Sequence, residues 1–255
     1  GASAPLAGAA SVPASTAPAV ASIGASAVPG TPAPAAPAAR EKIEVTTDVY
    51  RLTFDGEGGS LTHAELLKHA DMTDKAKNFV LFDESTQRVY VAQTGLIGGS
   101  FPTHKTVMTA VPGPRAFKDG ENELTIRFES PEQGGVKLVK TWTLKRGAYD
   151  IAVKHEVVNV GSTAVSPQLY LQLVRDGNKP PGESSFYSTF TGPAVYTDAK
   201  KYQKIEFKDI ENGKVDIPKE SPNGYVAMVQ HYFASAWLLA DGVQRELFTR
   251  KVSDN

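Results

Sequence analysis

The sequence contains no cysteine, which excludes disulfide bonds and thiolate metal sites. It has no excess of either charge, since 27 Lys and Arg residues against 28 Asp and Glu residues give a formal net charge of −1. There is thus no electrostatic case for binding nucleic acid or an anionic membrane surface. No window approaches the roughly 18 to 20 apolar residues that span a bilayer. The chain begins at glycine without a signal-peptide pattern, as expected of a fragment whose export or membrane signal was removed.

Residues 1–39 lack charged and aromatic side chains and consist mostly of Ala, Pro, Ser, Gly and Thr. The prolines spread through them remove backbone donors and block helix interiors. Without large apolar side chains the segment cannot bury enough surface to offset its ordering entropy. We therefore predict a disordered Ala/Pro-rich linker over residues 1–40, in preference to short Ala-rich helices, and a globular domain over residues 41–255.

The clearest structural pattern in that domain is a hairpin over residues 136–159. On its first arm Leu138, Trp142 and Leu144 share one face, and Lys137, Thr141, Thr143 and Lys145 share the other. Successive strand side chains point to opposite faces, so this period of two predicts a half-buried strand. Gly147 can take the positive φ that a short hairpin loop requires. His155 falls on the apolar face of the second arm, where a hydrogen-bonded core histidine is expected.

Similar alternation, bounded by Gly, Pro, Asn and Asp turns, recurs along the chain. Residues 61–69 fit either a helix or a strand, and the strand is favoured. Residues 204–207 are expected to be extended, and the apolar run 224–240 to form a central strand buried on both faces. Many short strands and no βαβ alternation predict an all-β fold, a sandwich of antiparallel sheets. The other strands are expected at 42–54, with a break near Thr47 and Asp48, and at 78–83, 88–94, 122–129 and 164–174, with a strand fragment near 105–110.

Catalytic motifs are not apparent. The histidines do not have the spacing of a helical zinc site, and no Gly-x-Ser-x-Gly elbow or phosphate-binding loop occurs. Carboxylates are plentiful, but a linear sequence cannot show whether two of them meet as a glycosidase pair. Residues 198–208 carry four lysines beside Tyr202, and Tyr196 precedes them, which suits either a partner-facing patch or an ordinary solvated face. The aromatic residues of 225–237 suit the core better than a ligand-stacking platform.

Taken together, several segments resemble the large periplasmic domain of the YidC/Oxa1/Alb3 membrane-protein insertases, in the Gram-negative YidC form. They occur in family order over most of the domain, and the ordered set is more specific than any one of its members. The Ala/Pro-rich linker also lies where the family has a low-complexity tether after its first membrane helix. The segments that carry the resemblance are 45–49 with 52–53 and 58–59, 90–96, 122–124, 144–149, 190–196 with 201–202, and 224–237.

The resemblance implies a β-supersandwich like that of galactose mutarotases, without cofactor or catalysis. It implies residence at the periplasmic face of the bacterial inner membrane, within a multi-pass parent that helps nascent membrane proteins to insert and fold. In the family the stretch matching residues 188–239 is associated with contact to the Sec translocon accessory protein SecF, a partner of SecD. The exposed candidates for that contact are Lys200, Lys201, Tyr202 and Lys204. Compared with the family, the chain lacks the membrane helices and stops before the last strands, so we expect a domain truncated at its C-terminus with an open sheet edge.

Two other functions remain open at this point. A carbohydrate-binding or carbohydrate-active protein of the same fold would need a carboxylate and histidines that converge in a concave cleft. Even without catalysis, the cleft of the sandwich could bind a ligand weakly. A general adhesion or assembly domain would need no such site and would not recognise the translocon subunits.

Overall fold

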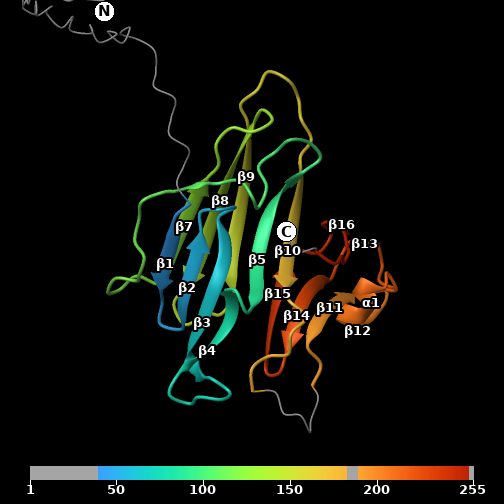
Figure 1. The fold of residues 1–255 in the computed structure, drawn as a ribbon. Coiled ribbons are helices and arrows are strands. Elements are labelled where there is room, and N and C mark those ends of the chain that lie inside the picture. Colours follow the sequence, from blue (N-terminus) through green and yellow to red (C-terminus); the bar gives the residue numbers. More distant parts are fainter. Residues whose placement is uncertain (1–39, 183–188, 253–255) are drawn as a thin grey trace, which may run out of the picture. The chain divides into compact units, whose positions relative to one another are not determined.

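The computed structural model describes residues 40–182 and 189–252. The linker predicted for residues 1–40 therefore lies outside the described residues, apart from Arg40. Almost all of the regular secondary structure in the described chain is β-strand, and the strands form several antiparallel sheets (Figure 1). No helix in these two ranges is long and apolar enough to cross a bilayer. The predicted all-β sandwich of antiparallel sheets is confirmed.

The largest sheet has six strands in the order β1-β2-β3-β4-β5-β10, with an additional pairing between β3 and β5. The segment 61–69 lies in β3, so the prediction of a strand there is confirmed. The bounds of these strands are β1 Lys42–Thr46, β2 Tyr50–Asp55, β3 Ser60–Ala70, β4 Asn78–Glu84, β5 Val89–Ile97 and β10 Gln168–Arg175.

A second sheet, in the order β6-β7-β8-β9, faces the first. It comprises β6 Thr109–Ala110, β7 Glu123–Glu129, β8 Val136–Lys145 and β9 Ile151–Asn159. The predicted hairpin is confirmed, because β8 and β9 pair antiparallel from Val136↔Asn159 to Leu144↔Ile151. Gly147 has a φ of 72°, as the turn requires.

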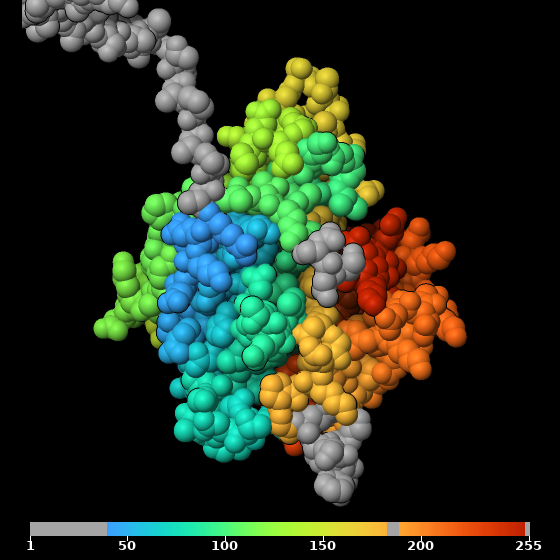
Figure 2. Space-filling model, viewed as in Figure 1, coloured from blue at the N-terminus to red at the C-terminus, as the bar shows by residue number. Residues whose placement is uncertain are grey.

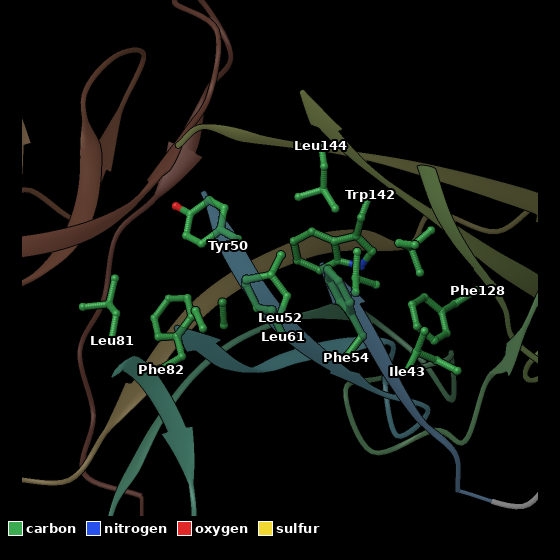
Figure 3. Close-up of a cluster of buried hydrophobic side chains, with 14 of the residues drawn as sticks. Ile43, Tyr50, Leu52, Phe54, Leu61, Leu81, Phe82, Phe128, Trp142 and Leu144 are labelled. Carbon is green, nitrogen blue, oxygen red and sulfur yellow. The ribbon is translucent and has the colours of Figure 1, made fainter. Parts of the chain in front are cut away.

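The core lies between these two sheets, and aromatic side chains fill its centre. Phe54 of β2 packs against Trp142 of β8 at 5.2 Å between ring centroids and against Phe128 of β7 at 6.2 Å. Figure 3 shows these rings pointing toward one another, with Leu52 and Leu144 around them. Burial of one face of each strand is the main stabilising contribution of such alternating sequences.

A third sheet has the order β12-β11-β14-β15. Figure 2 shows its residues as an orange to red lobe beside the blue and cyan surface of the six-stranded sheet. A short helix, α1, and a pair of two-residue strands accompany it. The bounds are β11 Gly192–Thr197, β12 Lys201–Lys204, α1 Phe207–Glu211, β13 Glu220–Ser221, β14 Tyr225–Gln230, β15 Phe233–Leu238 and β16 Arg245–Glu246.

Side chains of β15 dock this third sheet onto the six-stranded one. Phe233 stacks on Phe79 of β4 at 4.0 Å between ring centroids. The Trp237 indole donates a hydrogen bond to the carbonyl oxygen of Gln172 in β10 at 3.0 Å. These contacts combine apolar burial with satisfied polar atoms, and they fix where the exposed side of the third sheet lies.

Two sequence predictions were wrong in detail. The run 224–240 is not one strand but the β14–β15 hairpin, which turns at His231 and Tyr232 without Gly or Pro to mark it. The segment 204–207 is extended only at its start, because β12 ends at Lys204 and α1 begins at Phe207. The first error arose because apolar residues continue through the turn with no Gly or Pro to mark it. The second arose because four residues are too few to show a period of their own.

Candidate interaction surface

The catalytic alternative requires histidines and carboxylates that converge. His155 lies on the inner face of β9, and its Nε2 is 2.8 Å from the Thr94 hydroxyl oxygen of β5. Burial, aided by the nearby Lys140 ammonium, lowers the pKa of His155 to about 4. The imidazole is therefore neutral at physiological pH. The prediction of a hydrogen-bonded core histidine is confirmed.

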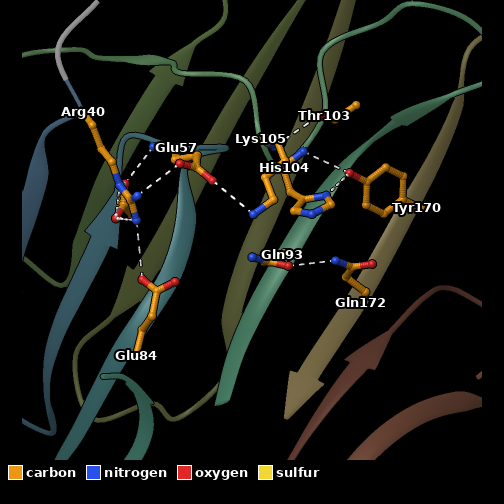
Figure 4. A network of polar contacts seen from close by, with 10 residues as sticks. Arg40, Glu57, Glu84, Gln93, Thr103, His104, Lys105, Tyr170 and Gln172 are labelled. Carbon is orange, nitrogen blue, oxygen red and sulfur yellow. Dashed lines mark hydrogen bonds and ion pairs between the residues drawn. The ribbon is translucent and has the colours of Figure 1, made fainter. Parts of the chain in front are cut away.

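His104 is also used structurally. Its Nδ1 lies 2.5 Å from the Tyr170 hydroxyl, which in turn accepts a hydrogen bond from the His104 backbone N–H at 2.9 Å (Figure 4). Tyr170 comes from β10 and passes over Gly95 of β5, where a Cβ atom would collide with the phenol. Burial lowers the pKa of His104. This contact fixes the 100–108 loop to the sheet, and the nearby Glu57 carboxylate pairs with Arg40 and Lys105.

Only one histidine, in the part of the chain that the structure describes, forms an ion pair with a carboxylate. His63 Nδ1 is 3.5 Å from Asp83 Oδ1, with both side chains about 30% exposed on the outer side of β3 and β4. No group of three or more potential metal ligands gathers within the described ranges. The described residues thus give no support to acid–base or metal chemistry on a sugar.

Lys140 is a buried polar residue that the sequence analysis did not single out. Its side chain has 0% exposure, although it lies on β8 between Leu138 and Trp142. The ammonium donates hydrogen bonds to the carbonyl oxygens of Gly58 and, at 2.7 Å, of Thr94. Burial lowers the pKa of Lys140 to about 7. Lys140 is two residues from both Leu138 and Trp142, so the period of two places it on their apolar face. This position alone predicts a buried lysine from the sequence.

The predicted partner-binding residues lie together on one sheet edge. Lys201, Tyr202 and Lys204 belong to β12, the edge strand of the third sheet, and Lys200 precedes it in the turn. The Lys200 ammonium pairs with Asp216 at 2.6 Å, and the Lys204 ammonium lies 5.2 Å above the Phe190 ring. Tyr202 is 45% exposed. The edge therefore combines positive charge with an accessible aromatic side chain.

The strand register extends Tyr202 into a row of aromatic side chains across the sheet. Tyr202 pairs with Tyr196 of β11, and Tyr196 pairs with Tyr225 of β14. Directly paired residues project on the same face of a sheet, and the Tyr196 and Tyr225 rings stack at 5.5 Å between centroids. Leu238 of β15, 69% exposed, ends the row. We call Tyr202, Tyr196 and Tyr225 the tyrosine row.

Sequence reasoning placed Tyr196 and Tyr202 beside the lysines but could not align them with Tyr225, because only the strand pairing brings the three into one row. It also treated 225–237 as core, which holds for one face of the hairpin only. Phe233 and Trp237 pack against the main core, whereas Tyr225 lies on the opposite, partly exposed face. Tyrosine is enriched at protein interfaces, whereas lysine is depleted there and suits the polar rim.

Over the described residues, the structure is thus an all-β domain whose third sheet carries the tyrosine row beside the β12 lysines. Comparison with known proteins identifies the class further. The chain belongs to the YidC periplasmic domain family, whose model matches residues 42–255.

Curated relatives carry the name "Membrane protein insertase YidC". That of Janthinobacterium sp. (strain Marseille) is 50% identical over 220 residues, which is 86% of this chain and 39% of the relative. That of Dechloromonas aromatica (strain RCB) is 46% identical over 251 residues, 98% of this chain and 45% of the relative. The chain thus spans less than half the length of these relatives. The name that these relatives share is that of an insertase.

Proposed function

We propose that this chain is the periplasmic domain of a multi-pass inner-membrane insertase and serves that protein as a partner-binding module. Its parent helps nascent membrane proteins to insert and fold, and the linker over residues 1–40 tethers the domain to the membrane. The partners are the Sec translocon accessory subunits SecF and SecD. They bind the β12 edge through Lys200, Lys201, Tyr202 and Lys204. The family membership and the names of the relatives support this proposal.

The observation that carries the proposed contact is the tyrosine row at a lysine-bearing sheet edge. Tyrosine supplies a large contact area at a small cost in conformational entropy, and it is enriched among residues that dominate binding energy. Lysines around it favour a partner with acidic side chains and speed its association. Lysines also protect sheet edges from unwanted pairing, so their presence at β12 alone would not suffice. The aromatic row is what distinguishes this edge from an ordinary solvated one.

The test is a pull-down of detergent-solubilised membranes that contain SecD and SecF on the immobilised chain. The wild type should recover both subunits, whereas Tyr202→Ala combined with Lys204→Glu should lower recovery at least about fivefold, as the loss of an interface hot spot does. Lys137→Glu, an exposed lysine on β8, is the matched control and should bind as the wild type does. Recovery of neither subunit by the wild type would instead indicate a general sandwich domain.

Isothermal titration with a panel of sugars tests the alternative of a carbohydrate-binding function. If the chain is a partner-binding module, we expect no heat of sugar binding. Millimolar or tighter sugar binding that is lost when carboxylates of the binding site are replaced would overturn it in favour of a carbohydrate-binding function.

A further inference from the structure

β9 lies at the edge of the second sheet, and on its open side it has no strand partner among the residues that the structure describes (Figure 1). Leu138 of β8 turns its backbone toward Ser130: its carbonyl oxygen accepts from the Ser130 N–H at 2.9 Å, and its N–H donates to the Ser130 hydroxyl at 2.8 Å. Val157 is paired with Leu138 and therefore directs its own N–H and C=O away from β8. Alternate residues point the same way, so the open side presents the backbone groups of Ile151, Val153, His155, Val157 and Asn159.

This edge has few of the features that keep sheet edges from pairing. The strand contains no proline or glycine, and Val157 and Val158, which point to opposite faces, are 43% and 47% exposed. The two edges of the facing sheet are contacted by other parts of the chain. The Thr46 N–H of β1 donates to the Arg115 carbonyl oxygen at 2.9 Å, and β10 accepts the hydrogen bond from Trp237. A long unprotected edge with exposed apolar side chains is a template for pairing with a further strand.

The sequence of β9 is complementary to itself when two copies run antiparallel. A two-fold axis at His155 places Val153 opposite Val157, and Lys154 opposite Glu156, of the second copy. The Lys154 and Glu156 side chains are 71% and 40% exposed on the outer face. Opposite charges on directly opposed residues stabilise a pair of strands. The low pKa of His155 keeps the two imidazoles that meet at the axis neutral at physiological pH.

Among neighbouring registers, only this one satisfies backbone and charge together. Hydrogen bonding on the open side requires odd-numbered residues to oppose odd-numbered residues, so the register can shift only in steps of two residues. A shift one way would place Lys154 opposite the second Lys154, and a shift the other way would place Glu156 opposite the second Glu156. Like charges directly opposite each other are destabilising. The register centred on His155 also pairs the whole of β9 with its copy.

We infer that this chain forms a two-fold symmetric dimer through β9, in which the two four-stranded sheets join into one and Lys154 and Glu156 fix the register. The interface is isologous, because the same strand serves on both copies. Pairing would satisfy the open backbone groups and cover Val157 with Val153 of the second copy. The inference goes beyond the proposed function, because it concerns another sheet, shares no residue with the β12 edge and needs no translocon subunit.

Analytical ultracentrifugation of the chain from micromolar to near-millimolar concentration tests the dimer, and charge variants test its register. Lys154→Glu and Glu156→Lys should each weaken dimerisation about tenfold or more, because two cross-strand pairs change from attraction to repulsion. An equimolar mixture of the two variants should form a heterodimer, since one carries two acidic and the other two basic side chains at these positions. Recovery in the mixture also shows that both variants are folded. Glu44→Lys, exposed on β1, is the matched control and should dimerise as the wild type does.

Engineered disulfides provide the second arm, because the chain has no cysteine of its own. Residues 152 and 158 are opposed across the proposed dimer at about 4.5 Å between Cα atoms, whereas within one strand they lie about 20 Å apart. Ala152→Cys combined with Val158→Cys should therefore give a covalent dimer on mild oxidation, and Ala152→Cys alone should give far less.

A wild type that stays monomeric would overturn the inference. So would charge variants that dimerise as tightly as the wild type, or equal crosslinking by the single and double cysteine variants. In the full-length insertase the double cysteine variant should crosslink likewise, and its failure there would mean that another segment of the longer protein covers β9. Lys154→Glu should still recover SecD and SecF in the pull-down, so failure of the proposed translocon contact would be seen separately.

Discussion

A lysine side chain lies in the middle of the aromatic core, and its environment explains how the two main sheets are held in register. Lys140 of β8 reaches across the sandwich to the carbonyl oxygens of Gly58 and Thr94, which belong to the other sheet. Thr94 also contacts His155, so one polar chain joins β5, β8 and β9. Such groups cost stability when charged and buried, but they restrict the core to one arrangement.

Replacement of Lys140 by methionine should change how stability depends on pH. Below pH 7 both states of the wild type carry the charge, whereas between about pH 7 and 10.5 the unfolded chain holds a proton that the folded chain has lost. Wild-type stability should therefore rise by about 2 kcal/mol between roughly pH 7 and 9. Denaturant unfolding of Lys140→Met over this range should lack that rise. An equal rise in both proteins would show that Lys140 is not the group responsible.

Protonation of His155 should likewise make the stability of the folded state increase with pH, here in the acid range. Its pKa of about 4 in the folded protein lies below the ordinary value, so between about pH 6.5 and 4 only the unfolded chain binds the proton. The folded state should lose about 3 kcal/mol over this interval because of this residue. His155→Gln, compared with the wild type by thermal unfolding at several pH values, should lose correspondingly less. Parallel curves for the two proteins would contradict the assignment.

Among the structural elements, the β14–β15 hairpin links the interaction surface to the core. One face of the hairpin carries Phe233 and Trp237, which dock on the six-stranded sheet, and the other carries Tyr225 of the tyrosine row. The position of the row relative to the rest of the domain thus depends on core packing by the same two strands.

Phe233→Ala should accordingly weaken the docking of the third sheet. The ring is half-buried and stacked on Phe79, so its removal should cost about 2 kcal/mol, part of the loss seen for a fully buried phenylalanine. Urea unfolding gives the cost, and faster amide exchange in β14 and β15 than in β8 would locate it. Ala234→Ser, an exposed neighbour, should stay within about 0.5 kcal/mol of the wild type. A loss of protection spread evenly over all sheets would argue against a separable docking contact.

The same elements mark how far the sequence alone could predict the structure. The β8–β9 hairpin was predictable because its alternation is long and Gly147 marks its turn. The turn at His231 and Tyr232 was not, because apolar residues continue through it and no breaker stands there. Among the site residues, the β12 lysines and Tyr202 were proposed from composition and family resemblance. Tyr225 joins them only through strand register, which a local pattern does not encode.

At the scale of the whole molecule, the sheets differ in what they bury and what they expose. The two main sheets enclose the aromatic core and hold the perturbed groups Lys140 and His155 away from solvent. The third sheet adds a smaller cluster around Val195, Ile205 and Leu247 and keeps one face partly exposed. A rigid sandwich that carries an exposed aromatic face suits a module that binds a partner while the reaction occurs elsewhere in a longer protein.

Site-specific photocrosslinking in the full-length insertase tests this account most directly. A photoreactive phenylalanine analogue placed at Tyr202 should form a crosslink to SecF or SecD in living cells, because the tyrosine row faces the partner there. The same analogue at Lys137, exposed on β8, should form none. Crosslinks to neither subunit from Tyr202, or equally strong crosslinks from both positions, would contradict the assignment of the β12 edge as the binding surface.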